Sequence, residues 1–424
     1  MKILVVGGGG REHALCWKIK KSPLVEKIYC APGNAGISKV ADCLSIKATD
    51  IEGLKEFAIN NSIDLTVVGP EQPLTMGIVD LFEKNNLKIF GPNEAASELE
   101  GSKVFSKNLM KKYSIPTANY ETFTDLDDAL GWINELKGSF VVKADGLAAG
   151  KGVIICNSFE EGKSALISII EDKTFGDAGN KVVVEEFLAG EEASIFVLTD
   201  GDKYIVLESS QDHKAIYDND KGPNTGGMGA YCPAPVVTDR ILKEVEQKIV
   251  RPTINGLNSE DIKYKGVLYI GLMINNGEVK VLEYNCRFGD PETQPVLMKM
   301  ESDIVPLFME IADGNLLTSS LSWKKGSTVC VVMSSKGYPG SYKKNVELTK
   351  LNQLSESEDV VLFHAGTKLD GKKTLTNGGR VLGLTVSGDS ISGAIEKVYK
   401  NISKIDDGLL YYRTDIGKKA VGRG

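Results

Sequence analysis

The chain has 424 residues, of which 42% are apolar and 25% are charged, and its formal net charge is −7. At roughly 150 residues per domain this length predicts about three domains, and the composition is typical of a soluble globular protein. The negative charge gives no electrostatic footprint for nucleic acid or an anionic membrane. No apolar run reaches membrane-spanning length, and the seven cysteines form no C-x-x-C pair. We therefore expect no membrane or nucleic-acid partner, no disulfide or zinc framework, and a cytoplasmic location.

The first 100 residues alternate between strand and helix patterns. Buried strands are predicted at residues 2–6, 63–68 and 87–90, and helices at 12–21 and 75–85. This alternation predicts a parallel, Rossmann-like sheet covered on both faces by helices.

Beyond residue 100 the pattern becomes richer in strands, which makes the whole chain a mixture of α/β and α+β domains. A helical pattern over 94–113 comes first, and Pro116 ends it. Strands are then predicted at 139–143, 153–155, 181–185, 193–198, 204–208, 267–274, 279–284, 328–333, 360–364 and 381–386. The segment 222–231 is so rich in glycine that we expect a loop there, with neither helix nor strand.

Four glycines, Gly7–Gly10, lie between the first strand and the first helix. They do not match the dinucleotide fingerprint, because the third glycine that it requires falls on Glu12. Backbone N–H groups at a helix start, together with Arg11, can bind a phosphate group. The alternative is a tight turn that needs glycine only for its shape.

The segment 143–152, KADGLAAGKG, is not a P-loop, because three residues separate Gly146 and Gly150 and a glycine follows Lys151. A glycine-hinged flap containing a lysine suits the covering of a nucleotide triphosphate. Lys143, at the end of a strand, can contact phosphate oxygens as a point charge. The alternative is a long hairpin turn.

Glu283, Asn285 and Arg287 alternate along a predicted strand, so they point to one face. A carboxylate and an amide oxygen suit Mg²⁺ bound to nucleotide phosphates, and the arginine suits a phosphoryl group or an acyl phosphate. The alternative is the solvated face of an amphipathic strand whose apolar face contains Leu282 and Tyr284.

Thirteen segments, taken in order, resemble the phosphoribosylamine–glycine ligase family almost along the whole chain. They are GGGGREHAL (7–15), APGN (31–34), GPE-x-PL (69–74), FGP (90–92), KADGLAAGKGV (143–153), EEFLAGEE (185–192), QDHK (211–214), GPNTGGMGAY (222–231), GVLYIGLM (266–273), RFGDPETQ (287–294), GYPG (337–340), FHAGT (363–367) and GGRVL (378–382). The resemblance implies an ATP-grasp fold in four parts: an N-terminal α/β domain (1–100), a central domain (101–120 and 189–325), a small lid (121–188) and a small β-rich C-terminal domain (326–424).

The implied reaction joins glycine to 5-phosphoribosylamine with ATP, giving glycinamide ribonucleotide, ADP and phosphate through glycyl phosphate, in purine biosynthesis. The implied cofactors are ATP and Mg²⁺ or Mn²⁺, and we expect a monomer. Glu283 and Asn285 match the family's metal ligands, and Asp212, Lys214 and Arg287 match its catalytic positions. The ATP-binding positions are Lys103, Lys143, Gly150, Lys151, Gly152, Glu185, Glu186, Leu188 and Glu192. The substrate-binding positions are Gly8, Gly9, Gly10, Arg11, Asn34, Glu71, Gly226, Gly227 and Met228.

The chain also departs from the family's usual pattern. Ala215 replaces an arginine and Asn219 replaces a glycine, and residues 267–273 lack the metal-binding carboxylate that many ATP-grasp enzymes have on this strand. Three other functions remain open: another ATP-grasp ligase such as a carboxylase, a non-catalytic nucleotide-binding protein, and an NAD oxidoreductase, which the glycine register argues against.

Overall fold

The computed structural model describes residues 1–147 and 152–422. Its N-terminal part is a five-stranded parallel sheet in the order β3-β2-β1-β4-β5. The elements are β1 (Lys2–Gly7), α1 (Gly10–Ile19), β2 (Lys27–Pro32), β3 (Asp42–Cys43), α2 (Ile51–Asn61), β4 (Leu65–Val68), α3 (Glu71–Thr75), α4 (Ile78–Lys84) and β5 (Ile89–Phe90). The strand order reverses between β1 and β4, so their carboxyl ends flank a crevice of the kind that binds ligands in such sheets. Gly8–Arg11 and Glu71 follow these two ends.

Two predicted helices are each divided in the structure. The helix expected over 75–85 is interrupted at Gly77, whose φ of +77° favours glycine and separates α3 from α4. The helical pattern over 94–113 forms α5 (Glu94–Gly101) and α6 (Lys103–Lys112). Ser102 between them is extended, and its hydroxyl accepts a hydrogen bond from the Phe105 amide, which caps α6.

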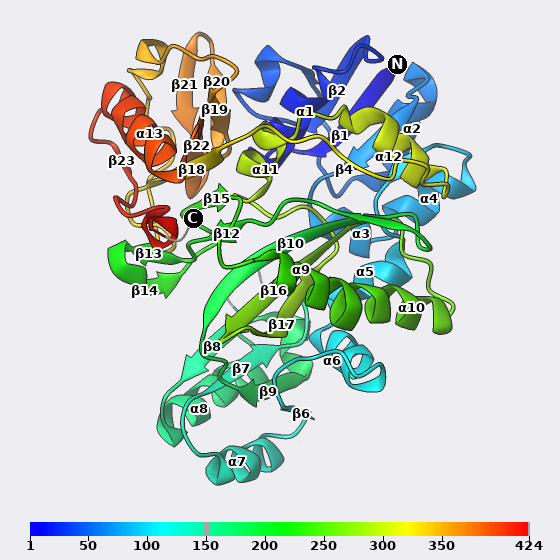
Figure 1. Cartoon of the computed structure of the whole chain (residues 1–424), viewed down its shortest axis with the longest axis vertical. Coiled ribbons are helices and arrows are strands. Elements are labelled where there is room, and N and C mark those ends of the chain that lie inside the picture. The colour runs from blue at the N-terminus through cyan, green and yellow to red at the C-terminus, as the bar shows by residue number, and fades with distance from the viewer. Residues whose placement is uncertain (148–151, 423–424) are drawn as a thin grey trace.

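The small lid, at the bottom of Figure 1, is an antiparallel sheet in the order β6-β9-β7-β8 with two helices. It consists of β6 (Tyr120–Phe123), α7 (Leu126–Glu135), β7 (Phe140–Ala144), β8 (Val153–Cys156), α8 (Phe159–Leu166) and β9 (Val182–Glu186). The hairpin predicted between residues 139–143 and 153–155 is confirmed, since Lys143 pairs with Val153 and Phe140 with Cys156.

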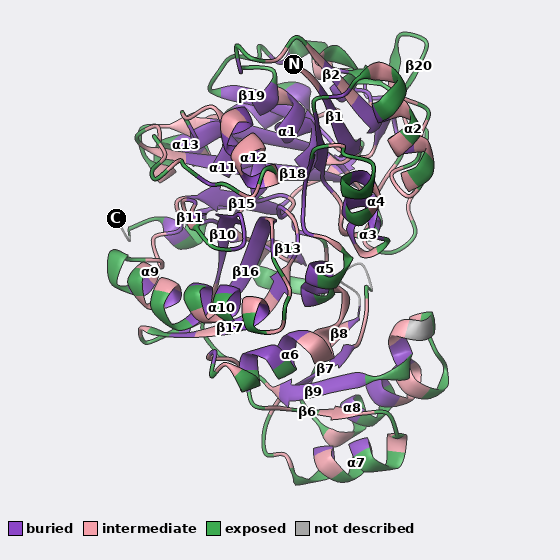
Figure 2. Ribbon diagram, turned by 90° about the vertical axis from the view of Figure 1, so that its right-hand side faces the viewer, coloured by how far each residue is buried: buried purple, intermediate pink, exposed green. Residues whose placement is uncertain are grey.

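The central sheet is antiparallel in the order β11-β10-β16-β17. Its strands are β10 (Glu191–Thr199), β11 (Tyr204–Val206), β16 (Gly266–Asn275) and β17 (Glu278–Asn285). Of the helices in this part of the chain, α9 (Asp239–Val245) contacts β17, α12 (Ile304–Ala312) contacts β16, α10 (Arg251–Ser259) contacts α6, and α11 (Thr293–Lys299) contacts α1. Figure 2 shows that β10 and β16 are buried, whereas α9 and α10 expose one face. No helix among the described residues is long and apolar enough to cross a membrane.

A second large sheet has the order β12-β15-β18-β22-β19, with β23 paired to β18. Its strands are β12 (Gln211–Asp212), β15 (Gly229–Cys232), β18 (Ser327–Ser335), β19 (Val360–His364), β22 (Arg380–Gly388) and β23 (Leu410–Tyr411). The helix α13 (Ile391–Ile405) contacts this sheet. Two small two-stranded sheets pair β13 (Ala215–Tyr217) with β14 (Lys221–Asn224) and β20 (Thr367–Asp370) with β21 (Lys373–Thr376). Two of these strands, β12 and β15, come from residues 211–232, so the middle of the chain adds strands to the C-terminal sheet.

The expectation of a strand-free loop at residues 222–231 is wrong. The segment includes most of β14 and β15, and every residue of β15 is buried. β15 pairs with β18 in antiparallel register from Gly229 opposite Val331 to Cys232 opposite Thr328. A Cβ atom at Gly229 would lie 2.7 Å from the Cys330 carbonyl oxygen, so close sheet packing requires the glycine. Tertiary pairing here outweighs a low intrinsic strand propensity.

Candidate active site

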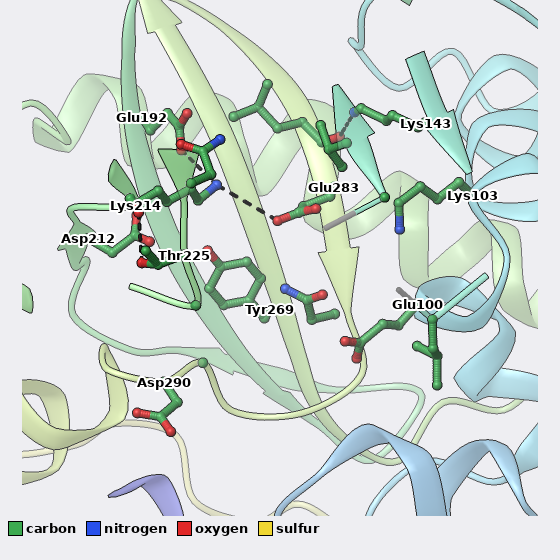
Figure 3. Close-up of a pocket in the computed structure, with 18 of the residues that line it drawn as sticks. Glu100, Lys103, Lys143, Glu192, Asp212, Lys214, Thr225, Tyr269, Glu283 and Asp290 are labelled. Atoms are coloured by element: carbon green, nitrogen blue, oxygen red, sulfur yellow. Dashed lines mark hydrogen bonds and ion pairs between the residues drawn. The ribbon is translucent and has the colours of Figure 1, made fainter. Parts of the chain in front are cut away.

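A cavity of about 500 Å³ lies where the lid, the central sheet and the two terminal sheets meet. The α/β domain contributes Arg11 and Glu71, the lid contributes Lys143, β17 contributes Glu283, and the C-terminal domain contributes Arg380. Figure 3 shows Glu283 between Lys214 on one side and Lys103 and Lys143 on the other. Segments that are distant in the sequence therefore surround one space.

Alternating residues at the end of β17 and just beyond it line this cavity as a group. Glu283, Asn285 and Arg287 all face it, in agreement with the period of two. Leu282 lines it too, so the expectation that Leu282 belongs to the apolar face is wrong. The reason is a β-bulge: Gly271 pairs with Glu283, but the next residue of β16, Leu272, pairs with Val281, which leaves Leu282 as the extra residue.

Lys214 is surrounded by carboxylates. Its Nζ atom lies 2.7 Å from Glu192 Oε2 and 3.9 Å from Glu283 Oε1. Burial alone would lower the pKa of Lys214, but Glu192, Asp212 and Glu283 outweigh it and raise that pKa well above its usual value. Burial also opposes the shift at Glu283, yet Lys214 and Lys103 lower its pKa. Both groups are therefore ionised at neutral pH.

Asp212 behaves differently from its neighbours. Burial raises the pKa of this carboxyl to about 8; Lys214 opposes the rise, whereas Glu292, Glu192 and Glu283 add to it. A carboxyl with such a pKa exchanges a proton near neutral pH, which is a property of groups that bind or transfer protons in active sites.

Arg287 is fixed by two carboxylates from other segments. Its Nε donates to Glu71 Oε2 at 3.2 Å and its Nη2 donates to Glu100 Oε1 at 2.7 Å. Burial opposes ionisation of Glu71, but Arg287 and Arg11 lower its pKa to about 2. The guanidinium is thus ordered before any ligand binds.

Lys143 and Glu185 belong to a buried ion cluster with Lys107. Both lysine Nζ atoms form ion pairs with the Glu185 carboxylate, and Lys107 also donates to Thr117 Oγ1 at 2.8 Å. Burial would raise the pKa of Glu185, but Lys143 and Lys107 outweigh it and lower that pKa. Burial lowers the pKa of Lys107 to about 8, against the attraction of Glu185.

The glycine turn Gly8–Gly10 forms hydrogen bonds with the side chains of Glu12 and Asn34. The Gly9 amide donates to Glu12 Oε2 at 2.5 Å, and Asn34 Nδ2 donates to Gly8 O at 2.9 Å and to His364 O at 2.8 Å. Arg11 lines the cavity, although its Nε donates to Glu12 and its Nη1 to Phe288 O. The arginine therefore faces the ligand space from a fixed position.

Comparisons with known proteins identify the family. The profiles described as phosphoribosylglycinamide synthetase N domain, ATP-grasp (A) domain and C domain match residues 1–100, 101–293 and 328–419. A phosphoribosylamine–glycine ligase of Caldanaerobacter subterraneus is 48% identical over 416 residues, which are 98% of this chain and 99% of the relative. One of Salmonella typhi is 48% identical over 427 residues, covering 100% and 99%. The chain belongs to the phosphoribosylamine–glycine ligase family.

Solved structures agree with this assignment. The crystal structure of a phosphoribosylamine–glycine ligase from Thermotoga maritima has a TM-score of 0.86 and 32% identity, covering 98% of this chain and 100% of that one. The biotin carboxylase domain of Hydrogenobacter thermophilus 2-oxoglutarate carboxylase, in complex with MgADP, ADP and bicarbonate, has a TM-score of 0.74 and 18% identity, covering 97% and 91%. That similarity shows the fold alone. The ATP-grasp fold and the family implied by the sequence motifs are confirmed, and the family binds ATP.

Most of the residues carried over from the family meet in the cavity. Those that line it are Arg11, Glu71, Lys103, Lys143, Gly152, Glu185, Glu186, Leu188, Glu192, Asp212, Lys214, Gly226, Glu283, Asn285 and Arg287. Gly8, Gly9, Gly10, Asn34, Gly227 and Met228 are absent from the described lining, and Gly150 and Lys151 lie outside the described residues. Met228 is fully buried, and Asn34 donates a hydrogen bond to the glycine turn at Gly8 O.

Several residues that line the cavity were not predicted from the sequence. They include Glu100, Thr225, Tyr269, Asp290, Glu292, Tyr338 and Arg380. All of these residues except Glu100 lie inside quoted family motifs, so the motifs contained a signal for them. Glu100 lies outside every motif.

The two departures from the family pattern have simple structural settings. Asn219 has a φ of +60°, a left-handed conformation that asparagine tolerates better than most residues other than glycine. Its amide donates to Asp415 Oδ2 at 2.8 Å. Ala215 is buried, and its carbonyl oxygen accepts from Arg413 Nη1 at 3.0 Å. Neither residue lines the cavity.

Proposed function

We propose that this protein joins glycine to 5-phosphoribosylamine at the expense of ATP, producing glycinamide ribonucleotide, ADP and phosphate in purine biosynthesis. The full-length similarity to phosphoribosylamine–glycine ligases carries the proposal. The cavity supports it, because it combines cations suited to phosphates with carboxylates suited to a metal and an ammonium group.

The nucleotide belongs to the side of the cavity next to the lid. Lys103 and Lys143 are positioned for its phosphates, and the segment from Glu185 to Glu192 is positioned for adenosine. An adenine edge pairs with backbone N–H and C=O groups. The Glu186 amide already donates to Asn119 O at 2.9 Å, so the Glu186 carbonyl and the Leu188 amide are the groups proposed for the adenine edge. Gly150, Lys151 and Gly152 complete the proposed ATP site as the covering flap.

Glu283 and Asn285 fit a divalent cation of the hard type, Mg²⁺ or Mn²⁺, because both line the cavity and both side chains contain oxygen atoms. Among the described residues, no three His, Cys, Asp or Glu side chains converge as a complete metal site. Nucleotide phosphates and water must therefore complete the coordination, as is usual for Mg²⁺. When bound, the cation would offset phosphate charge and polarise the γ-phosphoryl group.

In the first step a carboxylate oxygen of glycine attacks the γ-phosphorus, the bond to the β-phosphate oxygen breaks, and ADP leaves. In the second step the amine of phosphoribosylamine attacks the acyl carbon, phosphate leaves, and the amine nitrogen loses a proton. Arg287 and Lys214 are positioned to stabilise the phosphoryl oxygens, and Asp212 to bind the glycine ammonium. The turn Gly8–Arg11, with Asn34 and Glu71, is proposed for the phosphoribosyl group, and Gly226, Gly227 and Met228 shape the glycine side.

We further propose a cytoplasmic monomer. The substrates are small molecules, and the chain alone supplies every group that the mechanism uses. Sedimentation of the purified protein tests the oligomeric state.

The test of the function is ADP release in the presence of glycine and of phosphoribosylamine generated in situ. We expect turnover only when both are present. Turnover with bicarbonate in place of glycine would instead assign the chain to a carboxylase-type reaction, the activity that the same scaffold supports in the structural relatives of low identity.

A further inference from the structure

We propose that Glu100 is a positioning residue that orients both Asn285 and Arg287. The inference rests on the proposed roles of these two residues at the metal and at the phosphoryl group. Figure 3 places Glu100 on the side of the cavity away from Asp212 and Lys214. It belongs to α5, so it reaches the strand end from a different segment of the chain.

The Glu100 carboxylate accepts hydrogen bonds from three consecutive residues. Its Oε2 accepts from the Cys286 backbone amide at 2.8 Å and from Cys286 Sγ at 3.1 Å. Its Oε1 accepts from Arg287 Nη2 at 2.7 Å. With the Asn285 amide turned so that its nitrogen faces Glu100, Nδ2 donates to the same Oε1 at 3.0 Å. Glu100 is only 6% exposed, so water competes little for these bonds.

These bonds determine which end of the Asn285 amide faces the cavity. Burial raises the pKa of Glu100, whereas the Arg287 guanidinium and the Cys286 donors oppose that rise and favour the ionised form. In that form the carboxylate only accepts hydrogen bonds, so it selects the nitrogen end of a neighbouring amide. The second N–H of Nδ2 donates to the Tyr284 carbonyl oxygen at 3.2 Å. Both donors of Asn285 are then used, and its Oδ1 is left for a ligand. Mg²⁺ binds oxygen, so Glu100 gives Asn285 the orientation that a metal ligand requires.

The same carboxylate fixes the guanidinium of Arg287. With Glu71 on Nε and Glu100 on Nη2, two edges of the planar group are bonded, so the plane cannot rotate freely. Metal ligands and their neighbours are commonly oriented by such outer hydrogen bonds, and loss of one typically weakens metal binding 10–100-fold. A purely structural Glu100 would instead neutralise buried Arg287 without affecting the metal.

The test is the variant Glu100→Gln, with Glu98→Gln as its matched control on an exposed position of the same helix. Binding of Mn²⁺ to the ADP complex is measured by electron paramagnetic resonance of free Mn²⁺. Metal-free ADP binding and the melting temperature are measured beside it. We expect Glu100→Gln to bind Mn²⁺ about 10–100-fold more weakly, with metal-free ADP binding unchanged. Glu98→Gln should match the wild type throughout.

A second experiment moves the carboxylate from position 100 to position 285, and its first variant does not depend on the stability of Glu100→Gln. Asn285→Asp places a second carboxylate against Glu100, so it should bind Mn²⁺ more weakly than wild type despite the added negative charge. The double variant Glu100→Gln/Asn285→Asp restores a donor facing an acceptor and should bind Mn²⁺ more tightly than Asn285→Asp alone. Wild-type Mn²⁺ affinity in Glu100→Gln, or tighter binding in Asn285→Asp than in wild type, would overturn the proposal.

The two proposals fail separately. Loss of the ligase function would show as a wild-type protein that binds Mn²⁺ and ADP but releases no ADP with glycine and phosphoribosylamine. Loss of the Glu100 role would show in the Mn²⁺ affinities, while wild-type turnover still required both substrates.

Discussion

Replacement of Glu283 by glutamine is the most direct test of the metal site. The side chain keeps its size but loses its charge, and it lies in the cavity beside Lys214, at 3.9 Å. If Glu283 binds the cation through an anionic oxygen, the variant should need far more Mg²⁺ for turnover. Its fold should survive, because the carboxylate is 31% exposed and lines a space rather than the core.

The expected loss of metal affinity can be compared with the loss caused by changing groups that only support a metal ligand. Changes in groups that only support a metal ligand weaken metal binding 10–100-fold, so loss of a charged ligand should reach at least the upper end, about 100-fold or about 2.7 kcal/mol. The Coulomb attraction between Lys214 and Glu283 is about 4 kcal/mol before solvation, at an effective dielectric constant of 20. Lys214 keeps Glu192 at 2.7 Å, so it should stay protonated in the variant.

The assay is turnover against Mg²⁺ concentration at fixed ATP, with thermal unfolding of both proteins. An unchanged Mg²⁺ requirement would refute the metal-ligand role. A lower melting temperature with normal turnover in the surviving protein would show that Glu283 is structural instead.

Three further predictions concern the other parts of the cavity. The pKa of Asp212 is raised to about 8, so its carboxyl is protonated below that pH. Glycine affinity should therefore increase about tenfold per pH unit up to about pH 8 and then level off. Calorimetry across pH 6–9 tests this, and the variant Asp212→Asn should bind glycine weakly at every pH. Lys107→Met should lower the free energy of unfolding by about 3 kcal/mol, the lower end for a broken buried ion pair, because Lys143 still neutralises Glu185. It should also raise the KM for ATP; denaturant unfolding and initial rates test both effects, and an unaltered KM would limit Lys107 to a structural role. A non-hydrolysable ATP analogue should slow hydrogen exchange in the hairpin peptide 140–156, since Lys143, Gly146 and Gly152 line the cavity; equal exchange with and without the analogue would contradict a lid that closes over the nucleotide.

Features that depend on local periodicity were predictable from the sequence. The strands alternate as expected, and Glu283, Asn285 and Arg287 meet in one cavity because side chains two residues apart share a face. Leu282 escaped this rule through a β-bulge, which the pattern of apolar residues does not reveal. The motifs supplied the remaining segments through their resemblance to the family, since spacing along the chain does not show that Arg11 and Arg287 face the same space.

Features that depend on burial of ordinary residues were not predictable. Glu100 and Lys107 sit in helical patterns among other charged residues, where a charged side chain is usually solvated. They are buried because α5 and α6 contact β17 and β9, and only the folded chain brings them beside Arg287 and Glu185. The strand β15 is a similar case, because its Gly229 packs closely against the Cys330 carbonyl oxygen of β18.

The arrangement of charges explains how a chain of net charge −7 can bind a triphosphate. Three of the cations proposed for phosphate groups are paired with carboxylates from other segments: Lys143 with Glu185, Lys214 with Glu192, and Arg287 with Glu71 and Glu100. These pairs orient the cations in the absence of ligand. When phosphate oxygens arrive, a lysine can exchange one anionic partner for another, so it does not have to be stripped of water at that moment. After such an exchange at Lys143, Glu185 would still be paired with Lys107. Local pairing, rather than a positive field over the whole protein, is therefore what prepares this site for its anionic substrates.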